Sequence, residues 1–217
     1  MNGPARRDVH RANDAHVHIT PRSVDPMAGE QAYLRDRDAH GIGISAIVTP
    51  STMGWDNETS FAVAARDPER FRVIARADVR HPDAAQRVAG LLARGASGIR
   101  LTLLGDADIS WLTDGTADEA SAVLDAAGAV VEMHAGPEQL PAVGRFAARW
   151  ARTRVVIDHL GRPDPARGPD SPGFTAFLAL AEHPHITAKT PNTTFFSRSG
   201  APFRDLVPFY ESALEAY

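Results

Sequence analysis

The chain has 217 residues, 43% of them hydrophobic, and a formal net charge of −4 at pH 7. That is enough apolar material for one sizeable core, and the charge balance, with no basic run interleaved with aromatics, excludes a nucleic-acid partner. There is no cysteine, so disulfides and thiolate metal sites are excluded, and any metal must be held by His, Asp or Glu.

The chain opens with a polar segment, 1–12, that we expect to be a tail. It carries three arginines and no apolar stretch of the kind found in secretory signals. Further along, no run approaches the ~20 apolar residues needed to cross a bilayer. We therefore expect a cytoplasmic protein with no membrane partner. The sequence says nothing of its oligomeric state.

From residue 13 onward, short apolar runs alternate with Ala-rich amphipathic runs. The predicted strands are 14–19, 44–49, 71–77, 98–103, 129–134, 154–159 and 186–190. The predicted helices are 31–40, 61–65, 82–94, 137–150, 174–182 and 203–217. This alternation predicts a parallel sheet covered by helices.

Two architectures compete for this pattern, an open doubly wound sheet and a closed barrel. A dinucleotide-binding open sheet would place a glycine-rich phosphate loop after its first strand. The sequence has Asp14-Ala15-His16-Val17-His18 there instead. We therefore predict an α/β protein of the (β/α)8 TIM-barrel type, forming one domain over 13–217. Only seven βα units are present, so the eighth strand and helix are missing from this chain.

Histidines mark the ends of several predicted strands. His16 and His18 are two residues apart on the first strand, so their side chains point to one face. His134 and His159 end the fifth and sixth strands. Active sites of barrels lie at the carboxyl ends of the strands, and paired imidazoles suit a divalent metal or the polarisation of a carbonyl. Two unrelated surface histidines are the alternative for the first pair.

Arginines form a second group of candidates. Arg100 lies in the fourth strand, Arg162 follows the sixth, and Arg198 follows the seventh. Guanidinium groups bind carboxylates bidentately, so the group predicts an anionic substrate. The alternative is that each arginine pairs with a neighbouring acid or is solvated.

Two further residues lie near predicted strand ends. Ser51 follows the second strand and could donate a hydrogen bond to a carboxylate, but no nucleophile elbow surrounds it. Lys189 ends the seventh strand, where it either forms an ion pair or faces the barrel mouth. The sequence does not separate these two roles.

Taken together, the motifs resemble a known family. The first-strand Asp-Ala-His-Val-His, the loop 50–57, the Gly-Ile-Arg of 98–100 and the Asp-His-Leu-Gly-Arg-Pro-Asp of 158–164 occur in this order in the amidohydrolase-related family. The set is most similar to 2-pyrone-4,6-dicarboxylate lactonases and their sugar-lactonase and muconolactone-hydrolase relatives. The likeness spans about residues 12–217.

The resemblance implies a hydrolase, a lactonase of aromatic compound catabolism, that opens a carboxylate-bearing cyclic ester. The residues that would polarise the ester carbonyl or hold a metal are His16, His18 and His159. Those that would bind substrate carboxylates are Arg100, Arg162 and Ser51. The pyrone lactonases look metal-independent, whereas several relatives hold one zinc- or manganese-like ion.

His134 lies at a strand end where metal-using relatives often place a histidine. It is therefore a candidate substrate-binding residue and, with His16 and His18, a candidate metal ligand. The expected cofactor is either none or one divalent metal ion.

One departure from the family concerns the water-activating base. The family takes this aspartate from its eighth strand, and this sequence stops at Tyr217. We expect a truncated sequence; an inactive, degenerate paralogue is the alternative. Two other functions stay open, namely a metal-dependent decarboxylase of the same superfamily and a non-catalytic carboxylate-binding protein.

Overall fold

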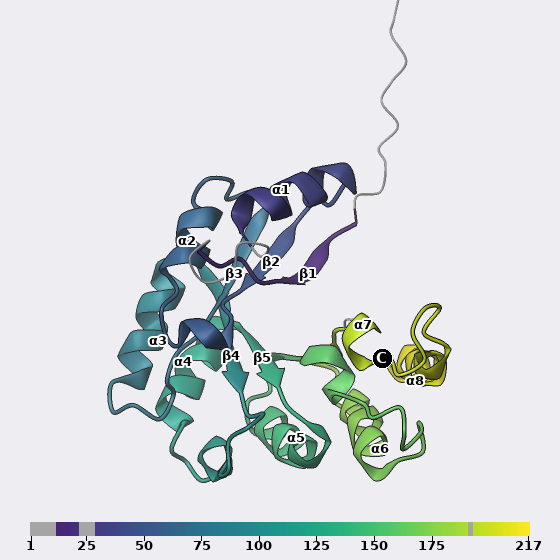
Figure 1. Ribbon diagram of the computed structural model, residues 1–217. Helices are drawn as coiled ribbons and strands as arrows, with labels where there is room; N and C mark the ends of the chain where they lie inside the picture. Colours follow the sequence, from purple (N-terminus) through teal and green to yellow (C-terminus); the bar gives the residue numbers. More distant parts are fainter. Residues whose placement is uncertain (1–11, 22–28, 191–192) are drawn as a thin grey trace, which may run out of the picture. The chain divides into compact units, whose positions relative to one another are not determined.

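The computed structural model describes residues 12–21, 29–190 and 193–217 (Figure 1). The chain divides into two compact units, Met1–Val73 and Ile74–Tyr217. Nearly all of the expected tail, 1–12, lies outside the described residues. Within the described ranges, no helix is long and apolar enough to cross a membrane.

The first unit is built around two parallel strands. β1 (Asp14–Val17) pairs with β2 (Ser45–Val48), and α1 (Glu30–Ala39) connects them. A 3₁₀ turn, Ser51–Met53, and α2 (Glu58–Ala64) follow β2. The unit buries its own small core, formed by Ile19, Ile47, Val63 and Phe71.

The second unit repeats the strand–helix pattern. Its strands are β3 (Phe71–Ala75, which begins in the first unit), β4 (Ala96–Thr102), β5 (Val130–His134), β6 (Arg154–Ile157) and β7 (Ile186–Ala188). Its helices are α3 (Ala84–Ala93), α4 (Asp118–Ala127), α5 (Leu140–Arg149), α6 (Pro172–Ala179), α7 (Thr193–Phe196) and α8 (Val207–Ala216).

The strand order decides between the two architectures. The seven strands follow one another in the sheet in sequence order, from β1 to β7. A doubly wound sheet would reverse its order at a switch point, whereas a singly wound barrel adds each strand beside the last. The prediction of a TIM-barrel type fold is confirmed.

Side chains along the central strands point alternately to the two faces of the sheet, and this alternation positions the site. Val131 and Met133 of β5 are fully buried under the helices, and Glu132 and His134 therefore point to the opposite face. In the register of β4 with β5, Arg100 lies beside Glu132, and Thr102 lies beside His134. One face of this part of the sheet thus carries the core, and the other carries polar side chains.

The bounds of the helix α4 were not predicted, although seven βα units require a helix between the fourth and fifth strands. Its Ala-rich sequence follows a loop rich in Asp and Gly, which obscured its start. The structure buries Ala120, Ser121 and Leu124 along one face, and Gly128 ends the helix in the left-handed conformation, at φ 57°. The short helix α7 was not predicted either.

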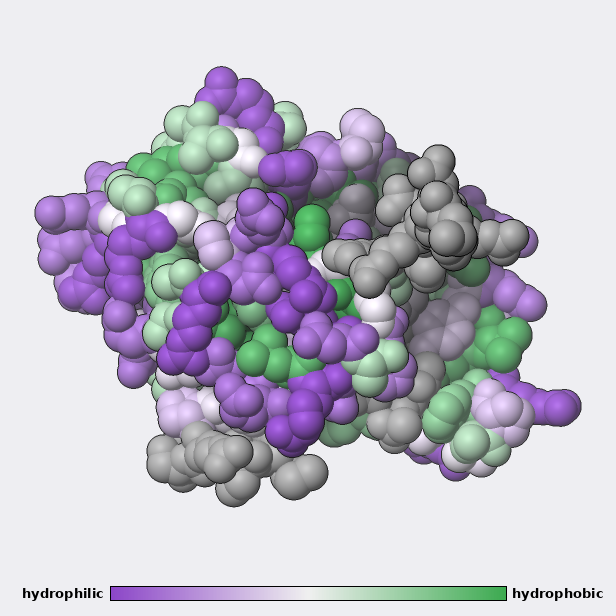
Figure 2. All heavy atoms as spheres, turned by 90° about the horizontal axis from the view of Figure 1, so that it is seen from above, coloured by the Kyte–Doolittle hydropathy of each residue, from purple (hydrophilic) through white to green (hydrophobic). Residues whose placement is uncertain are grey.

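Polar residues dominate the face of the molecule drawn in Figure 2, with hydrophobic ones visible in smaller areas between them. Few large hydrophobic side chains are exposed among the described residues; the most exposed are Leu214 at 82% and Phe195 at 69%. Scattered single residues of this kind are ordinary for a folded domain.

Candidate active site

His16 and His18, in the first unit, lie against each other at the end of β1. Their Nε2 atoms are 3.2 Å apart. Nδ1 of His18 lies 2.7 Å from the carbonyl oxygen of Val48 on the neighbouring strand. A carbonyl only accepts, so Nδ1 of His18 carries a hydrogen, and in the neutral ring Nε2 is the nitrogen with the lone pair.

This geometry fits a divalent cation. Two imidazole nitrogens at roughly 2.05 Å from one tetrahedral zinc ion are about 3.3 Å apart, close to the observed 3.2 Å. A backbone carbonyl that accepts from the other ring nitrogen is also the usual support of a metal-bound histidine. The two residues could therefore supply half of a tetrahedral ligand set.

Asp14 holds the backbone of this histidine pair. Its Oδ1 accepts the backbone N–H of His16 at 3.0 Å, and its Oδ2 accepts the hydroxyl of Tyr33 at 2.9 Å. The Tyr33 hydroxyl also lies 2.7 Å from Ser45 Oγ. Burial raises the pKa of Tyr33 to about 12, with Asp14 adding to the rise, so Tyr33 stays a neutral hydrogen-bond donor.

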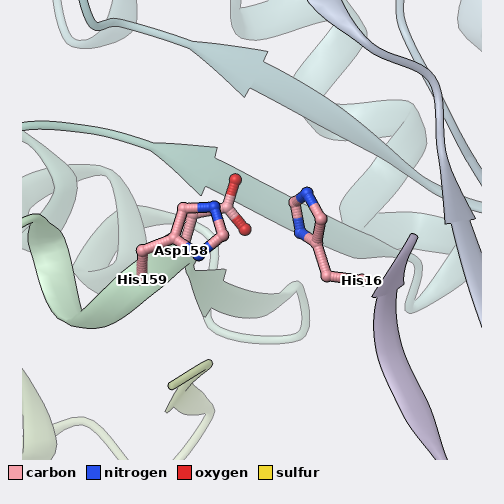
Figure 3. Close-up of side chains that lie close together, drawn as sticks. All are labelled: His16, Asp158 and His159. Atoms are coloured by element: carbon pink, nitrogen blue, oxygen red, sulfur yellow. The ribbon is translucent and has the colours of Figure 1, made fainter. Parts of the chain in front are cut away.

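In the second unit, a tight turn directly after β6 carries the next candidates. Figure 3 shows Asp158 and His159 leaving the chain one after the other at this point, and His16 on β1. The prediction that the strand continues to His159 was wrong. β6 ends at Ile157, because 159–162 all adopt positive φ, between 53° and 66°.

Left-handed backbone is costly for residues that carry a Cβ. His159, Leu160 and Arg162 all adopt it, on either side of Gly161. The turn is held by backbone bonds, from the Leu160 N–H to the Lys189 carbonyl at 2.9 Å and from the Arg162 N–H to the His159 carbonyl at 2.9 Å. Strain of this kind concentrates at functional sites, and here it directs the side chains of His159 and Arg162.

Below this turn lies a buried network of four charges. Arg100 binds Oδ2 of Asp158 through Nε at 2.9 Å and Nη2 at 2.7 Å, and its Nε is 3.6 Å from Oε1 of Glu132. Lys189 contacts Glu132 as well. Of the two roles left open for Lys189, the structure shows the ion pair. Arg100 is 3% exposed and already holds a carboxylate of its own chain.

Arg162 is placed differently from Arg100. It is half-buried, its guanidinium lies over the rings of Phe195 and Phe196, and its Nη1 is 3.5 Å from Nε2 of His134. Within the described part of the chain, no carboxylate lies within ion-pair distance of it. Burial lowers its pKa, and the nearby charge of Arg100 lowers it further.

The His134 ring is neutral in this setting. Burial, followed by the charge of Arg100, lowers its pKa from 6.5 to about 3. Its ring stands edge-on to that of His159, with centroids 6.2 Å apart. Arg162 can only donate, so Nε2 of His134 accepts and Nδ1 carries the hydrogen.

A cavity of about 740 Å³ lies beside this cluster, wholly within the second unit. Its walls come from the loops and helix starts that follow β4, β5 and β6, and they include Leu104, Gln139, Arg162, Asp164 and Phe174. This volume lies in the usual range of small-molecule sites. Arg162, which belongs to the strained turn, lines this cavity.

The sequence model of a family described as amidohydrolase matches residues 4–217. The chain belongs to the amidohydrolase family. The predicted resemblance is thereby confirmed.

Curated relatives of this amidohydrolase are lactone hydrolases. It is 30% identical over 151 residues to an L-fucono-1,5-lactonase of Burkholderia ambifaria, with 68% of this chain and 52% of the relative covered. It is 25% identical over 232 residues to a 2-pyrone-4,6-dicarboxylate hydrolase of Comamonas testosteroni, with 95% and 73% covered. The chain thus spans about half the length of that lactonase.

Solved structures of amidohydrolases share the fold. A probable 2-pyrone-4,6-dicarboxylic acid hydrolase of Acinetobacter baumannii, with citric acid bound, superposes with a TM-score of 0.82 at 22% identity, covering 94% of this chain and 79% of that one. An amidohydrolase of Burkholderia multivorans with bound zinc gives 0.75 at 24% identity, covering 95% and 80%.

The remaining predicted site residues of this amidohydrolase lie nearer the surface. Ser51 is exposed and begins the 3₁₀ turn after β2. Arg198 is exposed, and its Nη2 binds Asp164 Oδ1 at 3.1 Å. Their substrate-binding roles stay predictions.

Sequence reasoning missed the residues that support the candidate side chains. Asp158 and Glu132 were not assigned as partners of Arg100, and Phe195 and Phe196 were not assigned to Arg162. A signal was present for Glu132, which alternation places on the face of His134. Nothing in the sequence identifies the two phenylalanines, because they reach Arg162 from α7, which follows a different strand.

Proposed function

We propose that this amidohydrolase opens a carboxylate-bearing lactone, of the kind of 2-pyrone-4,6-dicarboxylate, by water attack on the ester carbonyl. The observation that carries the proposal is Arg162. A half-buried guanidinium beside a cavity, with no carboxylate partner among the described residues, has its charge available for an anion.

The relatives support both the reaction, which is hydrolysis of a lactone, and the negative charge of its substrate. Two of them are hydrolases of cyclic esters, and a structural neighbour holds citric acid, a small anion with several carboxylates. Arg162 supplies the positive charge that such a substrate needs. The rings of Phe195 and Phe196 hold the guanidinium in place and keep water from one of its faces.

We further propose that His16, His18 and His159 act on the ester carbonyl. In a barrel the carboxyl ends of all strands open to the same face, so side chains that follow different strands can serve one substrate. Imidazole N–H groups, or a metal ion held by the imidazole nitrogens, stabilise the oxyanion that forms as water attacks. The strained turn after β6 fixes the direction of His159, and Asp14 fixes the backbone of His16.

A divalent ion, zinc or manganese, fits the paired histidines of the first unit. His16 and His18 would hold it through Nε2, and the resemblance suggests His159 or His134 as a further ligand, the latter only if its Nε2 is released from Arg162. When bound, such an ion polarises the carbonyl and lowers the pKa of water. We assign the activation of water to no residue of this sequence, since the resemblance places that aspartate on an eighth strand.

Turnover of lactones tests the proposal. Protein expressed from its complete reading frame would be mixed with 2-pyrone-4,6-dicarboxylate and followed by ultraviolet absorbance, with L-fucono-1,5-lactone followed by acid release. Each assay would be run with and without chelator. Loss of absorbance that survives chelation supports a metal-independent pyrone lactonase, and loss that chelator abolishes supports the metal-assisted form.

Arg162 provides the matched control. Arg162→Met should raise KM for the dicarboxylate by about 100-fold, and Arg162→Lys by less, because a lysine keeps the charge without the planar fork. Release of carbon dioxide without ring opening would contradict the proposal and favour the decarboxylase. Binding of the dicarboxylate without turnover would contradict it in favour of a binding protein.

A further inference from the structure

The last residues of β4 and β5 form a polar pair, and the proposed mechanism leaves its Thr102 unused. Thr102 ends β4, His134 ends β5, and the two are direct register neighbours. Thr102 is two residues beyond Arg100, and His134 is two beyond Glu132, so both side chains lie on the polar face of the sheet. Adjacent strands are about 4.8 Å apart, which brings the two side chains together.

Each side chain of this pair has a buried atom without a partner. Thr102 Oγ1 and His134 Nδ1 are both shielded from solvent and have no hydrogen-bond partner among the described residues. Buried polar atoms in folded proteins are nearly always hydrogen-bonded, and the exceptions call for an explanation. Two exceptions side by side point to a ligand that completes them.

The cavity comes within two residues of each member of this pair along the chain, although neither Thr102 nor His134 is one of its lining residues. Its wall includes Leu104, two residues after Thr102, and Gly136, two residues after His134. Arg162, which also lines it, contacts the other nitrogen of the His134 ring. A molecule held by Arg162 would therefore extend toward the ends of β4 and β5.

We propose that Thr102 is a specificity-determining residue that, with His134, hydrogen-bonds an uncharged oxygen of the lactone, a hydroxyl or a carbonyl, beside the anionic group held by Arg162. The proposal rests on the proposed function. Nδ1 of His134 can only donate, and the threonine hydroxyl can both donate and accept. An uncharged oxygen satisfies both atoms, whereas a carboxylate is matched better by the neighbouring guanidinium.

A pair of variants tests this assignment. Thr102→Val keeps the shape of the side chain and removes the hydroxyl, and Thr102→Ser keeps the hydroxyl. The protein from the complete reading frame would be assayed on 2-pyrone-4,6-dicarboxylate and L-fucono-1,5-lactone. On a lactone that the wild type hydrolyses, we expect kcat/KM to fall about tenfold or more in Thr102→Val and less than about threefold in Thr102→Ser.

Two further readouts separate binding from structure. The melting temperature of ligand-free Thr102→Val should be equal to or above that of the wild type, because an unsatisfied buried hydroxyl has been removed. Its loss of kcat/KM should not depend on salt, whereas the loss in Arg162→Met should shrink as salt screens the charge.

The outcomes distinguish a failure of this proposal from a failure of the proposed function on which it rests. If the wild type hydrolyses no lactone, the proposed function fails and the subsite falls with it. If the wild type is active and Thr102→Val keeps kcat/KM within about twofold, only the subsite is overturned. A clear drop in the melting temperature of Thr102→Val, or equal losses in the valine and serine variants, would also overturn it by showing a packing role.

Discussion

Arg100 places two nitrogens on a single oxygen of Asp158, Nε at 2.9 Å and Nη2 at 2.7 Å. Both side chains are buried, and Glu132 and Lys189 complete a group of two cations and two carboxylates. The charges of this group cancel, so removing any one of them leaves an uncompensated charge inside the protein.

Replacing Arg100 should therefore lower the stability of the protein more than it weakens substrate binding. We expect Arg100→Met to lower the free energy of unfolding by about 3 kcal/mol or more, because Asp158 loses its partner in a buried setting. Urea unfolding measures this. Arg162→Met is the control, with an expected cost below about 1 kcal/mol, since it breaks no ion pair. Unchanged stability with a raised KM would instead assign Arg100 to the substrate.

The paired histidines should show the opposite behaviour. We expect His16→Ala to lower kcat by about 100-fold or more while the melting temperature changes by only a few degrees, because His16 is assigned to the chemistry rather than to the core. Bound zinc, measured by elemental analysis, should fall with it. The exposed His40 on the connection after α1 supplies a control, His40→Ala. Full activity in His16→Ala would rule out the assignment.

The strained turn offers a comparison of two glycines. Gly161 and Gly168 both have positive φ, 66° and 74°, so alanine is strained at either position. A Cβ at Gly161 would lie 2.9 Å from Leu140, whereas one at Gly168 meets nothing within 4 Å. We expect Gly161→Ala to destabilise by about 2 kcal/mol more than Gly168→Ala, as urea midpoints would show. Equal costs would mean that Leu140 moves aside freely.

His134 should make folding sensitive to acid. Its pKa is about 3 in the folded protein and 6.5 in the reference state. Between these values the unfolded chain binds a proton that the folded chain does not, so stability falls as pH drops from about 6.5 toward 3. The slope of unfolding free energy against pH, measured with chelator present, should decrease in His134→Gln. An NMR titration that found His134 charged at pH 5 would contradict this.

The sequence could predict the features that depend on hydrophobic periodicity and on the residues at the strand ends. The alternating pattern predicted seven strands and the barrel-type order, and a spacing of two placed His16 beside His18. It could not predict that β6 ends before Asp158, because neither His159 nor Leu160 is a residue type that indicates a left-handed backbone. Only Gly161 hints at it.

Partners that lie far apart in the chain were also out of reach. Arg100 and Asp158 are separated by 58 residues, and the sequence left an acid partner and a substrate carboxylate as equal alternatives for that arginine. The structure shows the acid partner, because the fold brings the turn after β6 to Arg100 on β4; a substrate-binding role for Arg100 stays a prediction. For Arg162 the same two alternatives existed, and the absence of an acid partner among the described residues could be learned only from the fold.

The carbonyl that fixes the tautomer of His18 belongs to the main chain of Val48. Position 48 is therefore free to exchange one buried aliphatic side chain for another without disturbing the imidazole. A mutational scan would score it as an ordinary core position, although its peptide group orients a candidate metal ligand. Comparisons of related chains that count side-chain identity would overlook this support as well, since every amino acid supplies the same oxygen there.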